Sequence, residues 1–252
     1  MQLATDAVVL HSFEYMESSR IVRLATRELG VVSAIARGAR RPRGRFGGGG
    51  ALDLYTGGKA QLAVRPGRDL QTLTGFDVTA SRLGLAGSLE RFTAAAAFSE
   101  LALRFLGDQP DPGSFDVVVA TLDSLSQASP GDVGAVTLGG SWRLIAELGF
   151  APAMSECAQC HAPVVDDAPA PFSHAAGGIL CGGCASRAPV GRPLPSAARA
   201  VISAWLAGQP EAVASSAELA AHQRLLRIFI QAHLGDGRSL PAYEAWESGR
   251  MA

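Results

Sequence analysis

The first 80 residues contain short runs of β-branched or alternating apolar and polar residues, separated by turn signals. Such runs predict strands, because successive side chains of a strand point to opposite faces. We expect five strands, at residues 5–13, 20–26, 31–37, 53–64 and 70–78. The last two are divided by Arg65-Pro66-Gly67-Arg68, a tight-turn sequence. Five short strands in about 80 residues predict a small closed barrel, with an OB-fold favoured over an SH3-like barrel.

Beyond residue 81 the apolar positions recur every three or four residues, which predicts helices. We expect them at residues 83–106, 115–125, 133–148, 197–206 and 217–234. On the last of these, one face is expected to carry Leu225, Ile228, Phe229 and Ala232. The helices should pack as a bundle. The chain is therefore predicted to be an α+β protein, with an N-terminal five-stranded OB-fold β-barrel followed by an α-helical bundle.

All four cysteines fall into two C-x-x-C pairs separated by twenty residues. Two residues between cysteines let both sulfurs of a tight turn face one ion, and two such turns supply the four thiolates of a tetrahedral zinc site. The pattern predicts structural Zn²⁺ bound by Cys157, Cys160, Cys181 and Cys184, in a module inserted into the bundle. The stretch between the outer cysteines has no lysine or arginine and includes Asp166 and Asp167, so it is a poor surface for phosphate.

Three other uses of the cysteines are weaker. Two disulfides would suit an oxidising compartment, for which the chain shows no secretory signal. Covalent haem attachment at Cys157–His161 would leave Cys181 and Cys184 unexplained. A catalytic zinc usually has three protein ligands and one open position, whereas four thiolates close the coordination sphere.

Charge divides the chain: residues 1–80 carry a net charge of +4, and the remainder carries −5. Between the third and fourth predicted strands, five arginines occur within nine residues with no acid among them, followed by four glycines. They are Arg37, Arg40, Arg41, Arg43 and Arg45. Mutual repulsion predicts an extended mobile loop, which an anion would stabilise. We expect these arginines to contact DNA phosphates without regard to sequence; a solvated loop without a ligand is the alternative.

Aromatic residues near this loop are few, namely Phe13, Tyr15, Phe46 and Tyr55. Electrostatic contacts to the DNA backbone are therefore expected to outweigh base stacking. No phosphate-binding P-loop, dinucleotide-binding glycine motif or hydrolase motif is present, so no enzymatic activity is expected. No apolar run approaches the roughly 18 residues of a membrane span, and we expect a cytoplasmic protein.

Three segments are distinctive in combination with the cysteine pairs. They are Ala36–Arg41 (Ala-Arg-Gly-Ala-Arg-Arg), Glu147–Pro152 (Glu-Leu-Gly-Phe-Ala-Pro) and His233–Gly235 (His-Leu-Gly). Together they resemble the bacterial RecO family of recombination mediators over nearly the whole chain. The loop departs from that family's pattern in its greater glycine content and near absence of lysine.

The resemblance implies an OB-fold that binds single- and double-stranded DNA, a helical domain, and a zinc module found in some members. It also implies a nucleoid-associated role in RecF-pathway repair: annealing complementary strands, acting with RecR, and helping RecA to displace single-strand binding protein. The corresponding domains are 1–80 (DNA binding), 81–152 (helical), 153–190 (four-cysteine zinc module) and 191–252 (C-terminal helices). Two alternative functions remain. One is a zinc-ribbon protein-interaction adaptor without DNA binding, and the other is a hydrolase or nuclease.

Overall fold

The computed structural model describes residues 1–41, 45–165, 167–188, 190, 192–235 and 237–249. Two residues singled out in the sequence, Arg43 and Asp166, lie outside these ranges. The chain forms two compact units. The barrel unit comprises residues 1–95 and 99–127, and the helical unit comprises residues 96–98 and 128–252.

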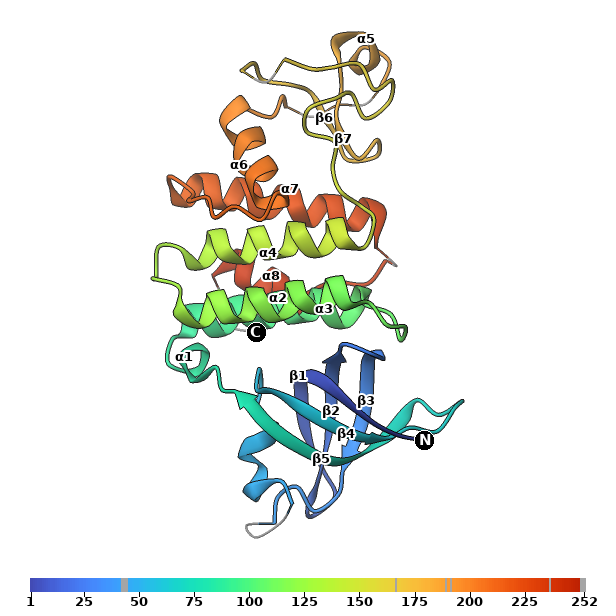
Figure 1. Cartoon of the computed structure of the whole chain (residues 1–252). Helices are drawn as coiled ribbons and strands as arrows, with labels where there is room; N and C mark the ends of the chain where they lie inside the picture. The colour runs from blue at the N-terminus through green and yellow to red at the C-terminus, as the bar shows by residue number, and fades with distance from the viewer. Residues whose placement is uncertain (42–44, 166, 189, 191, 236, 250–252) are drawn as a thin grey trace. The chain divides into compact units, whose positions relative to one another are not determined.

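The barrel unit contains a closed barrel with the strand order β1-β2-β3-β5-β4 (Figure 1). Its strands are β1 (Gln2–Tyr15), β2 (Ser19–Thr26), β3 (Gly30–Ala36), β4 (Gly57–Ala63) and β5 (Leu70–Ala80). All neighbouring strands pair antiparallel except β3 and β5, which run parallel. The predicted five-stranded barrel is confirmed. The fourth strand begins at Gly57 rather than at residue 53, because Tyr55 adopts a φ of 67°, which a strand does not accommodate.

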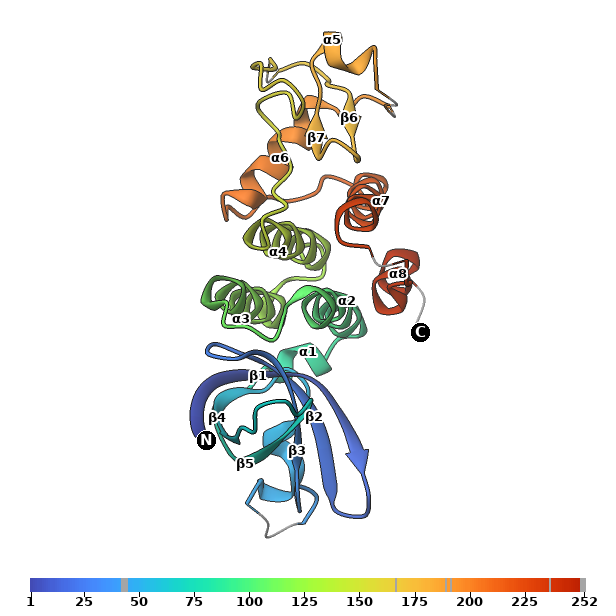
Figure 2. The same ribbon diagram turned by 90° about the vertical axis from the view of Figure 1, so that its right-hand side faces the viewer.

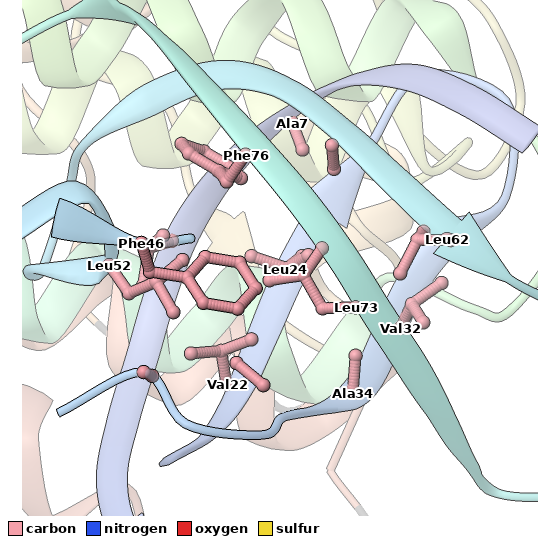
Figure 3. Packing of buried hydrophobic residues seen from close by; sticks show 14 residues of the cluster. Ala7, Val22, Leu24, Val32, Ala34, Phe46, Leu52, Leu62, Leu73 and Phe76 are labelled. Atoms are coloured by element: carbon pink, nitrogen blue, oxygen red, sulfur yellow. The ribbon is translucent and has the colours of Figure 1, made fainter. Parts of the chain in front are cut away.

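Inside the barrel, alternate side chains from all five strands form one apolar cluster. Phe46 comes from the arginine-rich loop, yet it lies among Val22, Leu24 and Leu73 in this cluster and is only 2% exposed (Figure 3). Burying a phenylalanine side chain contributes roughly 1.5–3 kcal/mol. The short 3-10 helix η1 (Gly47–Leu52) follows directly.

The arginine-rich loop, residues 37–46, therefore has two buried residues that anchor it to the barrel. They are Ala39 near its start and Phe46 at its end. Sequence alone predicted an extended mobile loop, because it could not show that an apolar residue beyond the arginines fills the barrel.

The barrel unit also contains α1 (Leu83–Ala86), α3 (Pro112–Gln127) and most of α2 (Leu89–Phe105). The single helix predicted over residues 83–106 is broken, because the Ser88 hydroxyl accepts a hydrogen bond from the backbone N–H of Arg91 and caps a new helix. Arg82 is buried between the barrel and α3. Its guanidinium donates to the Tyr55 carbonyl at 2.7 Å and to the Asp123 carboxylate at 2.8 Å.

The helical unit is built round α4 (Val133–Glu147), which packs against α6 (Ser196–Leu206) and α7 (Ser216–His233) (Figure 2). A methyl group at Gly139 would lie 3.1 Å from the Trp205 ring, so glycine permits the close approach of α4 and α6. The rings of Trp142 and Phe229 meet edge to face at 5.1 Å.

Two helical details differ from the sequence-based expectation. On α7, His222, Gln223, Leu226, Phe229 and Ile230 are the buried residues. Of the apolar face predicted there, only Phe229 is buried, because α7 is rotated towards its packing partners.

The helix α8 (Pro241–Ser248), which packs against α7, was not predicted. Its signal was Pro241 in the first turn, followed by apolar Tyr243 and Trp246 three residues apart. Among the described helices, none is long and apolar enough to cross a membrane.

Candidate nucleic-acid interface and metal centre

The two cysteine pairs meet within a segment of little regular structure, whose elements are β6 (Phe172–Ser173), β7 (Gly178–Ile179) and α5 (Gly182–Ala185). The first pair forms a turn closed by the His161 N–H, which donates to the Cys157 carbonyl at 2.9 Å. The Ala158 N–H then donates to the Ile179 carbonyl at 2.8 Å. Since Ile179 lies two residues before Cys181, this bond places the first turn beside the second pair.

The four sulfur atoms form one cluster, with all of them within 4.8 Å of one another. The Cys160 and Cys181 sulfurs are 3.7 Å apart. Tetrahedral coordination with Zn–S bonds of about 2.3 Å separates sulfurs by about 3.8 Å, so the donor set and spacing fit a four-coordinate ion. All four cysteines are free thiols rather than disulfides. The predicted convergence of the two pairs into a cluster able to hold a metal ion is confirmed.

The electrostatics of the cluster favour a cation. A hydrogen bond from the Cys181 backbone lowers the pKa of Cys157 to about 6. By contrast, hydrogen bonds with the Cys160 and Cys181 side chains raise the pKa of Cys184 to about 12. Four thiolates this close together would repel one another, so ionising all of them requires a positive ion at the centre.

A buried arginine holds the cysteine segment against α6. Arg199 is 2% exposed, and its guanidinium donates to the carbonyl oxygens of Val165 at 2.6 Å, Ala168 at 2.9 Å and Met154 at 2.9 Å. These three carbonyls belong to the chain before and after the first cysteine pair. Backbone carbonyls thus accept from the charged guanidinium, and one side chain of α6 ties together the chain on both sides of the first cysteine pair.

Arg199→Met is expected to destabilise the helical unit by about 3 kcal/mol, because it removes three charge-assisted hydrogen bonds and leaves the buried Met154 carbonyl without this donor. Chemical denaturation measures this, and limited proteolysis should cut the cysteine segment first. Arg187→Met, which removes an exposed arginine from the same segment, serves as control and should change stability by less than about 0.5 kcal/mol. Equal stability of the two variants would contradict the anchoring role.

On the barrel surface, three connecting segments surround a groove of about 900 Å³. They are the β1–β2 turn, the segment after β3, and the β4–β5 turn that leads into β5. The residues lining this basic groove are Tyr15, Met16, Ser18, Ser19, Ile35, Arg37, Gly38, Arg41, Arg68, Asp69, Leu70 and Thr72. Three cations and one acid line it, so its net charge is positive.

The structure separates the arginines predicted to contact DNA. Arg37 and Arg41 line the basic groove. Arg40 forms an ion pair with Glu14 at 2.9 Å, and Arg45 donates to the Thr74 carbonyl at 2.7 Å. Both are exposed, so these contacts are weak and a phosphate can compete for either side chain.

Sequence reasoning missed Arg68. It was assigned to a tight turn, which is where it lies, but its charge was not connected with the arginine-rich loop. The connection depends on β3 and β5 being neighbours, which brings the β4–β5 turn to the same groove as the end of β3. The sequence did contain a signal for this contact. The β4–β5 turn holds two arginines, Arg65 and Arg68, and the loops of OB-folds commonly contact ligands.

Comparison with known proteins covers both units. The family model described as "Recombination protein O N terminal" matches residues 1–82, and "Recombination protein O C terminal" matches residues 86–241. The DNA repair protein RecO of Anaeromyxobacter dehalogenans is 38% identical over 235 residues, covering 90% of each chain. That of Rubrobacter xylanophilus is 32% identical over 246 residues, covering 96% of each chain. That of a Nocardioides species is 32% identical over 246 residues, covering 94% of this chain and 97% of its own.

Proposed function

The chain belongs to the RecO family of DNA repair proteins, which are non-enzymatic recombination mediators, and from that premise we propose that it binds DNA through its barrel and anneals complementary strands. The basic groove carries this proposal. It brings Arg37 and Arg41 together with Arg68, all within residues 1–80, which carry a net charge of +4. Each phosphate neutralised by such a side chain releases bound counterions, which drives binding without reading sequence.

Annealing follows from the same electrostatics. Two complementary strands repel each other through their phosphates, and this repulsion slows the encounter that precedes base pairing. Arginines that neutralise the phosphates reduce the repulsion and leave the Watson–Crick edges free. The contacting residues are Arg37, Arg40, Arg41, Arg43 and Arg45; Arg37 and Arg41 make the strongest contacts because they line the groove.

The ion of the cysteine cluster is zinc in this proposal. Four thiolates at tetrahedral spacing are the donor set of structural zinc sites, and a closed coordination sphere leaves no position for catalysis. Zinc stabilises the segment 153–190, which has little apolar core of its own. The barrel at 1–80 binds DNA, and the helices at 81–152 and 191–252 form the helical domain.

The partners follow from the family. RecR and single-strand binding protein are the protein partners, and RecA benefits indirectly when the mediator helps it load onto strands coated by single-strand binding protein. This is the action of the RecF pathway in the bacterial cytoplasm, at the nucleoid. Double-stranded DNA is bound as well, because counterion release drives binding to duplex as well as to single-stranded DNA.

The proposal predicts that the protein accelerates annealing of labelled complementary oligonucleotides coated with single-strand binding protein by about tenfold or more, since charge neutralisation raises encounter rates by that order. Loss of quenching or gain of energy transfer between the labels follows the reaction. Arg187→Ala, remote in sequence from the barrel, should anneal normally. Failure to bind single-stranded DNA in fluorescence anisotropy would contradict the proposal and favour the protein-interaction adaptor.

A further inference from the structure

We infer that the outer end of β1 (residues 11–15) is an interaction surface for a second copy of this chain. The two copies pair this strand edge to edge, antiparallel, around a twofold axis at Phe13. The association depends only on the geometry of the barrel, whereas its consequence for annealing rests on the proposed function.

The outer end of β1 is paired on one side only. On that side β2 lies beside it throughout. On the other side, the ladder with β4 ends at Val8. Val9 makes the last backbone bonds there, donating to the Thr56 carbonyl at 3.0 Å and accepting from the Tyr55 N–H at 2.7 Å. Past Val9, no backbone hydrogen bond within the described part of the chain reaches β1 from this side.

A β-bulge marks the point where this edge opens. The register between β1 and β2 shifts between Val9 and His11, and a bulge bends the strand that carries it. Alternate residues beyond it direct their N–H and C=O groups away from β2. Natural proteins often protect such an edge with lysine or proline. This edge has neither, and its acid, Glu14, is engaged with Arg40 at 2.9 Å, so the edge is a template for another strand.

One face of the outer end of β1 carries three rings. Phe13 is 44% exposed and Tyr15 is 37% exposed, and the His11 ring lies 5.7 Å from the Phe13 ring. These residues share a face because successive side chains of a strand alternate. A second strand with rings on the same face would cover part of this apolar surface.

An axis through Phe13 gives a self-complementary register. It sets Phe13 opposite its counterpart and His11 opposite the second copy's Tyr15, so aromatic rings meet across the interface. Glu14 then lies opposite the second copy's Ser12, and no two acids face each other. An axis through Glu14 would oppose two carboxylates. An axis between two residues would put the rings of the two copies on opposite faces.

This pairing brings two proposed DNA sites together. The turn that follows the outer end of β1 contributes Met16 and Ser18 to the basic groove, so the grooves of two paired copies lie near the shared strands. Annealing requires two strands at once, and a pair of copies can hold one strand each. Holding both strands on one assembly raises their effective concentration for each other.

Sedimentation equilibrium of the full chain measures the association. The wild type should dimerise with a dissociation constant on the order of 10–100 µM, because a short edge pairing is smaller than a standard interface. Phe13→Glu and Phe13→Lys each oppose two like charges at the axis and should weaken dimerisation at least about tenfold. Mixed in equal amounts, these two variants should associate within about threefold of the wild type, because opposite charges then meet.

Val78→Glu is the matched control, since it places the same charge on a 47% exposed apolar residue of β5 and should dimerise like the wild type. Thermal melting of each variant verifies the fold. A wild type that stays monomeric at about 500 µM would overturn the association and leave the edge to another protein's extended segment. A dimer that survives Phe13→Glu, or no association in the mixture, would overturn the β1 interface.

Annealing separates this inference from the proposed function. Phe13→Glu should bind a labelled single strand within about threefold of the wild type but anneal complementary strands at least about threefold more slowly. Annealing at the wild-type rate would contradict the role of the pair. A wild type that dimerises but binds no DNA would overturn the proposed function and leave the β1 interface standing.

Discussion

Replacing Arg37 and Arg41 together with alanine is expected to weaken binding of single-stranded DNA about 100-fold at low salt, because both side chains line the basic groove and each charge-assisted contact to a phosphate contributes on the order of 1.5 kcal/mol. The slope of log affinity against log salt should fall by about 1.4, since each lost phosphate contact removes about 0.7. Fluorescence anisotropy titrations at several salt concentrations measure both quantities.

The paired variant Arg40→Ala, Arg45→Ala changes the net charge by the same amount and provides the comparison. Its loss should be smaller, about tenfold or less, because Arg40 is engaged with Glu14 and Arg45 with the Thr74 carbonyl. Equal losses for the two double variants would show that the loop acts as a diffuse cloud of charge. An unchanged salt slope in the Arg37, Arg41 variant would rule out phosphate contacts by these residues.

Replacing Cys157 and Cys160 with serine is expected to abolish metal binding and unfold the cysteine segment. Structural zinc contributes on the order of 10 kcal/mol to the folding of comparable small modules, which exceeds the roughly 3 kcal/mol expected from the Arg199 contacts. Metal analysis should fall from one ion per chain to none. Limited proteolysis should cut within residues 153–190, and thermal melting should show the helical unit destabilised.

The same variant should bind single-stranded DNA within about threefold of wild type, because the proposed contacts all lie on the barrel unit. Treating the wild type with a chelator provides an independent comparison and should reproduce the proteolysis pattern. A cysteine variant that melts normally but binds DNA poorly would reverse the assignment and place the metal segment in the DNA interface.

Local sequence was a good guide wherever one segment specifies its own conformation. The five strands follow from period-two runs and turn residues, and the metal cluster follows from the C-x-x-C spacing, because each turn itself directs two sulfurs to one point. Boundaries failed where a single residue overrode the pattern. Tyr55 at positive φ delayed the fourth strand, and Ser88 capped a new helix within an alanine-rich run.

The proposed DNA interface was only half visible in the sequence. Five arginines in nine residues marked a cationic loop, but the sequence could not show that Phe46 anchors it in the barrel, or that Arg40 has an acidic partner. Ion pairs and core contacts join residues far apart in the chain, so no window of sequence contains both members.

The sequence by itself thus determined the barrel, the helical region, the cysteine pairs able to hold a metal ion and the sign of the charge near the loop, because each depends on residues close together in the chain. Only the tertiary structure decided which arginines share a surface. Arg68 joins Arg37 and Arg41 because barrel closure makes β3 and β5 neighbours, although more than thirty residues separate them in the chain. Likewise, Arg199 holds the cysteine segment across 31 to 45 residues, through hydrogen bonds that exist only once α6 has docked.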